Sequence, residues 1–149
     1  MRHTRLDHRF VEYIPETIEP GVLYISITYA TAVHKCCCGC GLDVVTPLTP
    51  TDWQMTFDGA TVSLSPSIGN WDFPCRSHYI IDRARVVIAP PWSDRQVAAE
   101  RHRDHRAKTE FYGVRQAEQA LPDSRVVQPS GTPVETGLWQ TIKRLWRNP

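Results

Sequence analysis

The chain has 149 residues, of which 41% are hydrophobic, and its 17 Lys and Arg nearly balance its 16 Asp and Glu. This size suits one compact domain with an appendage, and the small net charge argues against binding of nucleic acid or an anionic membrane through charge alone. Residues 1–10 are charged and lack the apolar core of a signal peptide. No apolar stretch reaches the roughly 18 residues that span a bilayer, so we expect a cytoplasmic protein.

The first two thirds of the sequence are typical of β-structure. Residues 22–29 are rich in β-branched and aromatic side chains and follow the turn-forming pair Pro20-Gly21. Two hairpins are indicated further on, one through Asp58-Gly59 and one through Asp82-Arg83-Ala84. In chain order, the expected strands span residues 22–29, 42–45, 53–57, 61–64, 78–81 and 85–88. We therefore predict a mainly β fold, with a small antiparallel domain over residues 1–91 that is built around the cysteine-rich segment of residues 36–40.

A helical extension is expected over residues 92–149. Ser93 or Asp94 can cap a helix that runs to about Tyr112 and is dense in charge, as in a solvated helical face. Residues 122–133 are polar and contain prolines, which is typical of a linker.

An apolar stripe near the end of the sequence predicts a further helix. Its side chains recur at helical spacing beside basic residues. They are Leu138, Trp139, Ile142, Leu145 and Trp146. This helix is expected to dock on its own domain, on a partner, or on a second copy of the chain.

Four of the five cysteines occupy five consecutive positions, and the fifth follows 35 residues later. Thiols this close in sequence are hard to explain by packing and are typical of a metal site that a distant ligand completes. Zinc takes four ligands at tetrahedral angles, so the chain has to curl at the cluster, and Gly39 and Gly41 allow this. We expect a structural Zn2+ held by Cys36, Cys38, Cys40 and Cys75.

Two neighbouring residues leave the ligand set open. His34 lies two residues before Cys36 and could replace one thiol, whereas Cys37 alternates out of phase with the other cysteines and is expected to be spare. Buried thiols without a metal are one alternative. An iron–sulfur centre is another, disfavoured because its usual ligands are separated by two or more residues. A site with four protein ligands has no open position, so the zinc is expected to be structural.

Polar residues before and after Cys75 predict a catalytic constellation. Ser77 and His78 are adjacent, so on a strand their side chains point to opposite faces and cannot form a nucleophile–base pair. Ser67 is therefore the preferred nucleophile for His78, on a tight turn whose N–H groups could stabilise an oxyanion.

The sequence does not decide which residues orient the imidazole or whether another histidine acts as the base. Asn70 or Asp72 could orient the imidazole, and His34 is a competing base if zinc does not use it. Purely structural roles also fit, with Ser67 in a turn and His78 as a buried strand residue. The GxSxG motif of many serine hydrolases is absent from the sequence.

Several segments between residues 10 and 90 together carry a resemblance to a known family. They are Tyr13–Glu16, Pro20–Tyr24, His34–Gly41, Thr46–Leu48, Asp58-Gly59, Ser63–Asn70 and Cys75–Tyr79. They resemble a bacterial family encoded beside ubiquitin-like proteins and E1- and E2-like enzymes, in operons called Bub. The resemblance implies a zinc-stabilised β-domain and a serine-peptidase-like deubiquitinase that trims a ubiquitin-like precursor or removes the modifier from its targets.

The resemblance bears on individual residues as well. The family's Ser-Ile-Gly-Asn and Ser-His-Tyr segments fall on Ser67 to Asn70 and on Ser77 to Tyr79, without deciding which serine attacks. Cys37 stands where the family reserves no ligand, which supports its being spare.

Two hypotheses for the function follow. In the first, Ser67 attacks a carbonyl in a flexible C-terminal tail, His78 accepts the proton, and zinc fixes the loop. In the second, the chain is a non-enzymatic zinc-binding adaptor that docks through the helix bearing Trp139 and Trp146. In both, the expected partners are a bacterial ubiquitin-like protein and E1- or E2-like enzymes, with no nucleic acid and no membrane span.

Overall fold

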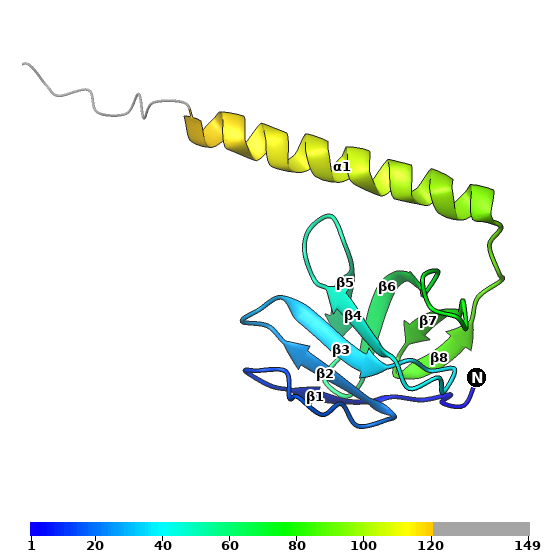
Figure 1. The fold of residues 1–149 in the computed structure, drawn as a ribbon. Helices are drawn as coiled ribbons and strands as arrows, with labels where there is room; N and C mark the ends of the chain where they lie inside the picture. Colours follow the sequence, from blue (N-terminus) through cyan, green and yellow to red (C-terminus); the bar gives the residue numbers. More distant parts are fainter. Residues whose placement is uncertain (121–149) are drawn as a thin grey trace, which may run out of the picture. The chain divides into compact units, whose positions relative to one another are not determined.

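The structure of the chain, a computed structural model, describes residues 1–120. Over these residues eight strands precede one helix (Figure 1), which confirms the prediction of a mainly β fold followed by a helical part. The strands are β1 (Asp7–Phe10), β2 (Val22–Ser26), β3 (Thr31–Lys35), β4 (Asp43–Pro47), β5 (Gln54–Phe57), β6 (Val62–Gly69), β7 (His78–Asp82) and β8 (Arg85–Ile88), and the helix is α1 (Asp94–Ala120). The linker expected over residues 122–133 and the apolar stripe with Trp139 and Trp146 lie outside the described residues.

The strands form two four-stranded sheets, in the orders β1-β2-β3-β4 and β5-β6-β7-β8. Neighbouring strands run antiparallel, except that β1 pairs with β2 in parallel. Parallel pairing departs from the expected antiparallel domain. Its cause is the connection over residues 11–21, which returns the chain to the start of the neighbouring strand instead of turning it back as a hairpin.

The two predicted hairpins are present, but β1 and β3 are missing from the sequence-based prediction. The strand expected over residues 22–29 ends at Ser26, and a turn that includes Ala30 at φ 46° leads into β3. Ile27 and Tyr29 have strand-like side chains, yet they are 62% and 55% exposed in this turn. The turn after Ser26 therefore cannot be predicted from the composition of these residues. The sequence of β1, Asp-His-Arg-Phe, lacks the β-branched residues that mark a strand.

One apolar cluster joins the two sheets and forms the main core. Leu23 and Ile25 of β2 contribute to it, as do Leu64 and Ile68 of β6 and the fully buried Tyr79 of β7. Alternate side chains of β2 point the other way into a smaller cluster, so β2 is buried on both faces.

The pairing of β6 with β7 changes register between Leu64 and Ile68. Leu64 pairs with Ile81 and Ile68 with Tyr79, so four steps along β6 match two steps along β7. Pro66 lies within this irregular stretch, where the missing N–H of proline does not interrupt a regular ladder. The strand therefore continues to Gly69, and Ser67 lies in β6 and not in the predicted tight turn.

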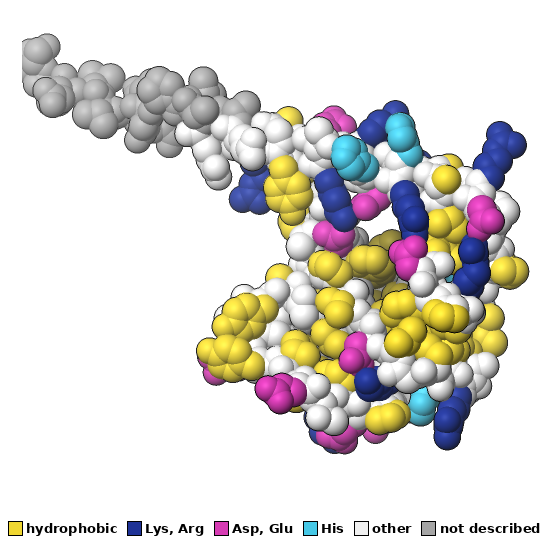
Figure 2. Space-filling view, in the orientation of Figure 1, with side chains coloured by type: hydrophobic (Ala, Val, Ile, Leu, Met, Phe, Trp, Pro, Cys, Tyr) yellow, Lys and Arg dark blue, Asp and Glu magenta, His cyan; other side chains and the backbone are white. Residues whose placement is uncertain are grey.

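Helix α1 begins with a capping box. The Ser93 Oγ accepts a hydrogen bond from the Gln96 N–H at 3.4 Å, and the Gln96 Oε1 accepts one from the Ser93 N–H at 2.9 Å. The predicted cap at Ser93 is thus confirmed, while the helix continues beyond Tyr112. Charged side chains follow one another along α1, and apolar side chains gather over the β-strands on the face that Figure 2 shows. Within residues 1–120, no helix has both the length and the apolar character that a membrane span requires.

Candidate functional site

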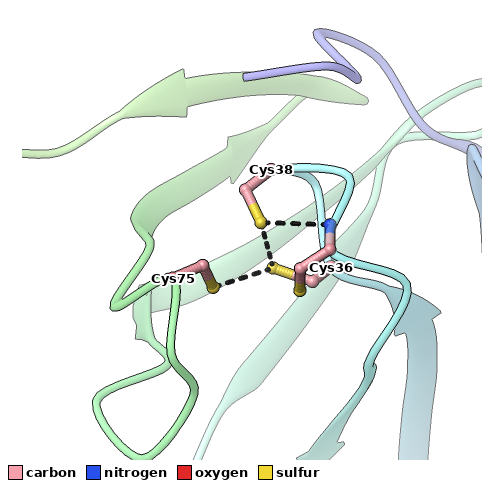
Figure 3. Close-up of side chains that lie close together, drawn as sticks. Cys36, Cys38 and Cys75 are labelled. Carbon is pink, nitrogen blue, oxygen red and sulfur yellow. Dashed lines mark hydrogen bonds between the residues drawn. The ribbon is translucent and has the colours of Figure 1, made fainter.

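The sulfur atoms of four cysteines meet between two segments that are distant in the sequence. Three of them come from the turn between β3 and β4 and the fourth from the segment before β7, and Figure 3 shows three of these side chains pointing toward one another. The four residues are Cys36, Cys38, Cys40 and Cys75, and their Sγ atoms all lie within 4.8 Å of one another. The expectation that these residues converge is confirmed.

The spacing of the sulfurs fits a metal ion. Cys36 Sγ lies 3.4 Å from Cys38 Sγ and 3.9 Å from Cys75 Sγ. A tetrahedral zinc with bonds of about 2.3 Å to sulfur holds its ligands roughly 3.8 Å apart. The chain curls between these ligands through Gly39 and Gly41, whose φ angles of 91° and 84° are in the left-handed region. The four cysteines can therefore hold a metal ion.

The two residues whose roles the sequence left open lie elsewhere. Cys37 is fully buried in the main core, and burial raises the pKa of its thiol to about 12, so it remains an uncharged packing residue. His34 is fully buried too, and its Nε2 lies 2.8 Å from the Tyr79 hydroxyl. Burial lowers the pKa of His34 to about 4, and the converging ligand set does not include this histidine.

Ser77 and Asn70 lie on the cysteine side of β7. Ser77 Oγ is 3.1 Å from Cys36 Sγ, and Asn70 Nδ2 donates to Ser77 Oγ at 2.9 Å. The Asn70 N–H also donates to the Ser77 carbonyl, which closes the loop between β6 and β7. The Asn70 side chain thus contacts Ser77 and not the histidine that was expected to be its partner. Asp72, the other expected orienting residue, accepts a hydrogen bond from Arg101 at 2.6 Å.

Ser67 and His78 meet on the opposite face of the strand pair. His78 pairs with Gly69, and Ser67 precedes that glycine by two residues, so both side chains lie on one face of the sheet. The Ser67 Oγ is 2.9 Å from His78 Nε2. As the alternation along a strand predicts, the adjacent Ser77 points the other way, toward the sulfurs.

The second ring nitrogen of His78 lies 2.6 Å from the Pro90 carbonyl oxygen. A carbonyl only accepts hydrogen bonds, so Nδ1 carries the proton and Nε2 is left as the acceptor for the Ser67 hydroxyl. A hydroxyl, an acceptor imidazole and a third group that fixes the tautomer make up the arrangement that activates a nucleophilic serine.

Two tryptophans enclose the imidazole. The Trp71 and Trp92 ring centroids lie 5.0 Å and 5.2 Å from that of His78, and the two indoles stack on each other at 5.5 Å with 16° between their planes. Gly69 makes room for this arrangement, because a Cβ at that position would fall 2.4 Å from the Trp71 ring.

Ser67, His78 and both tryptophans line a cavity of about 610 Å³, a size typical of ligand sites. Its charged lining residues are paired. Lys108 of α1 contacts Asp52 at 2.7 Å and Asp104 at 3.0 Å, Arg101 contacts Asp72, and Arg103 contacts Glu100. The cavity thus presents aromatic and hydroxyl groups next to charges that already neutralise one another.

A family profile described as "Bacterial ubiquitination-like system serine protease (BubE)" matches residues 10–89. The chain belongs to this family. The match confirms the resemblance to the Bub group and supports a serine-protease-like role in a bacterial ubiquitination-like system. The matched residues of this BubE family member include the cysteine cluster and both Ser67 and His78. No curated protein and no solved structure matches the chain.

Sequence reasoning did not find the aromatic surroundings of His78 or its partner at Pro90. Trp71 and Trp92 come from two segments with no periodic pattern, and a backbone carbonyl is the same in every residue. The pair Pro90-Pro91 lies at the predicted boundary between the β-domain and the helical extension, and its sequence does not indicate a contact with His78.

Proposed function

We propose that this BubE family member is a serine hydrolase that processes or removes a bacterial ubiquitin-like protein, with Ser67 as nucleophile and His78 as general base. The 2.9 Å contact between the Ser67 hydroxyl and His78 Nε2, in the wall of a cavity, carries this proposal. The family description as a serine protease supports it independently of the geometry.

The reaction follows from the hydrogen bonds. Ser67 Oγ attacks the carbonyl carbon of the scissile bond while His78 Nε2 takes the hydroxyl proton. His78 then gives this proton to the leaving amine, and the acyl group stays on Ser67. Water gives its proton to His78, attacks the ester and releases the carboxylic acid, and the proton returns to Ser67. Throughout, the bond from Nδ1–H to the Pro90 carbonyl holds the ring in one orientation, and in the neutral ring it keeps the proton on Nδ1.

We propose that the metal is Zn2+ and that its role is structural. A bound zinc would link Cys36, Cys38 and Cys40 to Cys75 through four thiolates, which suits its preference for tetrahedral sulfur ligands. Cys75 lies three residues before His78, so a metal bound to Cys75 would fix the segment that leads into β7. The Ser77 hydroxyl and, through it, Asn70 contact the sulfurs, as residues that orient metal ligands do.

The lining of the cavity suits an extended, uncharged peptide segment. The charged groups at its wall are paired with one another, so a charged substrate side chain would have to displace an existing partner. The indoles of Trp53 and Trp71 and the Thr51 hydroxyl line this cavity and can contact a peptide backbone without a charged partner. A flexible C-terminal tail of a ubiquitin-like protein can supply such a segment where its side chains are uncharged.

A fluorophosphonate probe tests the nucleophile directly, because it phosphonylates activated serines. The expected result is one modified peptide containing Ser67, with the label lost in Ser67→Ala and retained in Ser77→Ala. A label that maps to Ser77 would overturn the assignment of Ser67.

Ser77→Ala separates the two serines further. The variant is expected to keep its cleavage rate within about a factor of ten, and its affinity for zinc is expected to fall about 10- to 100-fold, because the thiolates lose a neighbouring hydroxyl. Titration with a competing chelator measures the affinity, and cleavage of a fusion to a ubiquitin-like protein measures the activity. Loss of all cleavage with the metal fully bound would make Ser77 the nucleophile.

Gly69→Ala is expected to lower kcat about 10-fold or more while the protein stays folded. The new Cβ would lie 2.4 Å from the Trp71 ring, so the indole has to leave its place beside His78. Gly113→Ala is the matched control, since it adds a methyl group on α1 with nothing within 4 Å and should leave kcat unchanged. Unchanged kcat in Gly69→Ala, with Trp71 shown by its NMR shifts to have moved, would mean that the position of Trp71 does not matter to the reaction.

A further inference from the structure

We infer that the segment Pro90–Trp92 is a positioning element for His78, so that the unit that performs the reaction extends past residue 89, where the family match ends. The inference rests on the proposed roles of Ser67 and His78. It departs from the boundary at residue 91 that composition suggests, because the contacts made by this segment point back to the histidine.

The first support is the carbonyl of Pro90, which lies 2.6 Å from His78 Nδ1. The segment is anchored where it leaves β8, because the Ala89 N–H donates to the His78 carbonyl at 3.0 Å. This bond brings the next carbonyl within reach of the ring of the same histidine. Ala89 thus fixes the backbone of His78 through the strand pairing, and the next residue, Pro90, fixes the tautomer of its ring.

The second support is the proline pair itself. A residue that precedes proline is restricted to extended backbone, and the proline ring fixes φ. Pro90 is subject to both restrictions because Pro91 follows it. The direction of the Pro90 carbonyl is therefore limited by covalent structure, and few of its other orientations remain accessible. A carbonyl held in this way takes the place that a carboxylate side chain has in other serine hydrolases.

The third support is Trp92. Its ring meets His78 at 66° and stacks on Trp71, which comes from the loop after β6. One indole of the pair thus lies inside the residues matched by the family and the other beyond them. Together they border the imidazole and leave Nε2 directed at Ser67. An imidazolium formed during proton transfer lies within 6 Å of both ring centroids, the distance at which indoles attract a cation.

Substitution of Trp92 in the full-length chain tests the inference. Trp92→Ala is expected to lower kcat about 10- to 100-fold, with a change in KM of no more than about threefold, because the histidine loses its alignment while the substrate cavity persists. Trp92→Phe retains an aromatic plane and should restore kcat to within about threefold of the wild type. Tyr29→Ala removes an exposed aromatic side chain that contacts Tyr13 elsewhere on the surface and should change neither kcat nor KM.

The proton on His78 Nδ1 gives a readout that does not depend on catalysis. In the wild type its NMR resonance should be shifted downfield by the bond to Pro90 and protected from exchange with water. The same signal is expected in Ser67→Ala and Trp92→Phe, and it should be broadened or lost in Trp92→Ala and in Pro91→Ala, which frees the carbonyl. If Trp92→Ala does not fold, the same measurements are made on Trp92→Leu, which keeps apolar volume without an aromatic plane.

The outcomes are distinct. Wild-type kcat and an unchanged Nδ1–H signal in Trp92→Ala or Trp92→Leu would overturn the inference. Wild-type cleavage by Ser67→Ala would instead overturn the proposed function, and an intact Nδ1–H signal in that variant would leave the positioning of His78 by residues 90–92 in place.

Discussion

Replacement of Ser67 by alanine is expected to reduce cleavage of a C-terminal extension from a ubiquitin-like protein by at least about 1,000-fold. The substitution removes only the hydroxyl group, whose oxygen lies 2.9 Å from His78 Nε2. Because Ser67 is half-buried at the edge of a cavity and outside the main core, the melting temperature and the metal content should stay at wild-type values. Single-turnover cleavage followed by mass spectrometry measures the effect.

The matched control is Ser65→Ala, two residues earlier on β6. Ser65 is exposed and makes no side-chain hydrogen bond within the described residues, so this variant should cleave at the wild-type rate. Cleavage by Ser67→Ala at a rate close to that of Ser65→Ala would remove Ser67 from the mechanism. Cleavage lost in both would point to a general disturbance of β6.

Loss of the metal is expected to unfold the segments that hold the site. Structural zinc sites bind with roughly 10–16 kcal/mol in small domains, which matches or exceeds the total stability of a typical fold of about 5–15 kcal/mol. We expect one zinc per purified chain, and we expect Cys75→Ser to lose the metal, melt far below the wild type and cleave no substrate. Elemental analysis, thermal unfolding and the cleavage assay measure these three effects.

Cys37→Ala is the control for loss of a thiol. Its sulfur belongs to the core and not to the converging set, so this variant should keep one zinc and lose only about 1 kcal/mol of stability through weaker packing. Wild-type protein that contains no stoichiometric metal and melts unchanged after chelation would refute the structural role of zinc.

Local patterns in the sequence were enough to predict the hairpins of the second sheet. Asp58-Gly59 and the turn after Asp82 are short-range features, and both join strands as predicted. The turn after Ser26 was missed because its residues resemble those of the strand before it. Parallel pairing of β1 was missed because nothing local distinguishes it from a polar loop.

The candidate site was predictable where it depends on strand alternation and unpredictable where it depends on loops. The opposite orientation of Ser77 and His78 follows from their adjacency, and this made Ser67 the better partner. The partners of Asn70 depend on how the loop between β6 and β7 closes, which no spacing rule gives. The indole pair depends on contact between segments 21 residues apart, Trp71 and Trp92, without any repeating pattern.

The adjacency of Ser77 and His78 at the start of β7 has a mechanical consequence. One peptide bond joins Ser77, whose hydroxyl contacts Cys36 Sγ, to His78, whose imidazole contacts the Ser67 hydroxyl. A metal ion held by the four thiols would therefore lie one peptide unit away from the residue that carries the imidazole. Removal of the metal would thus act on the imidazole through the short backbone segment from Cys75 to His78.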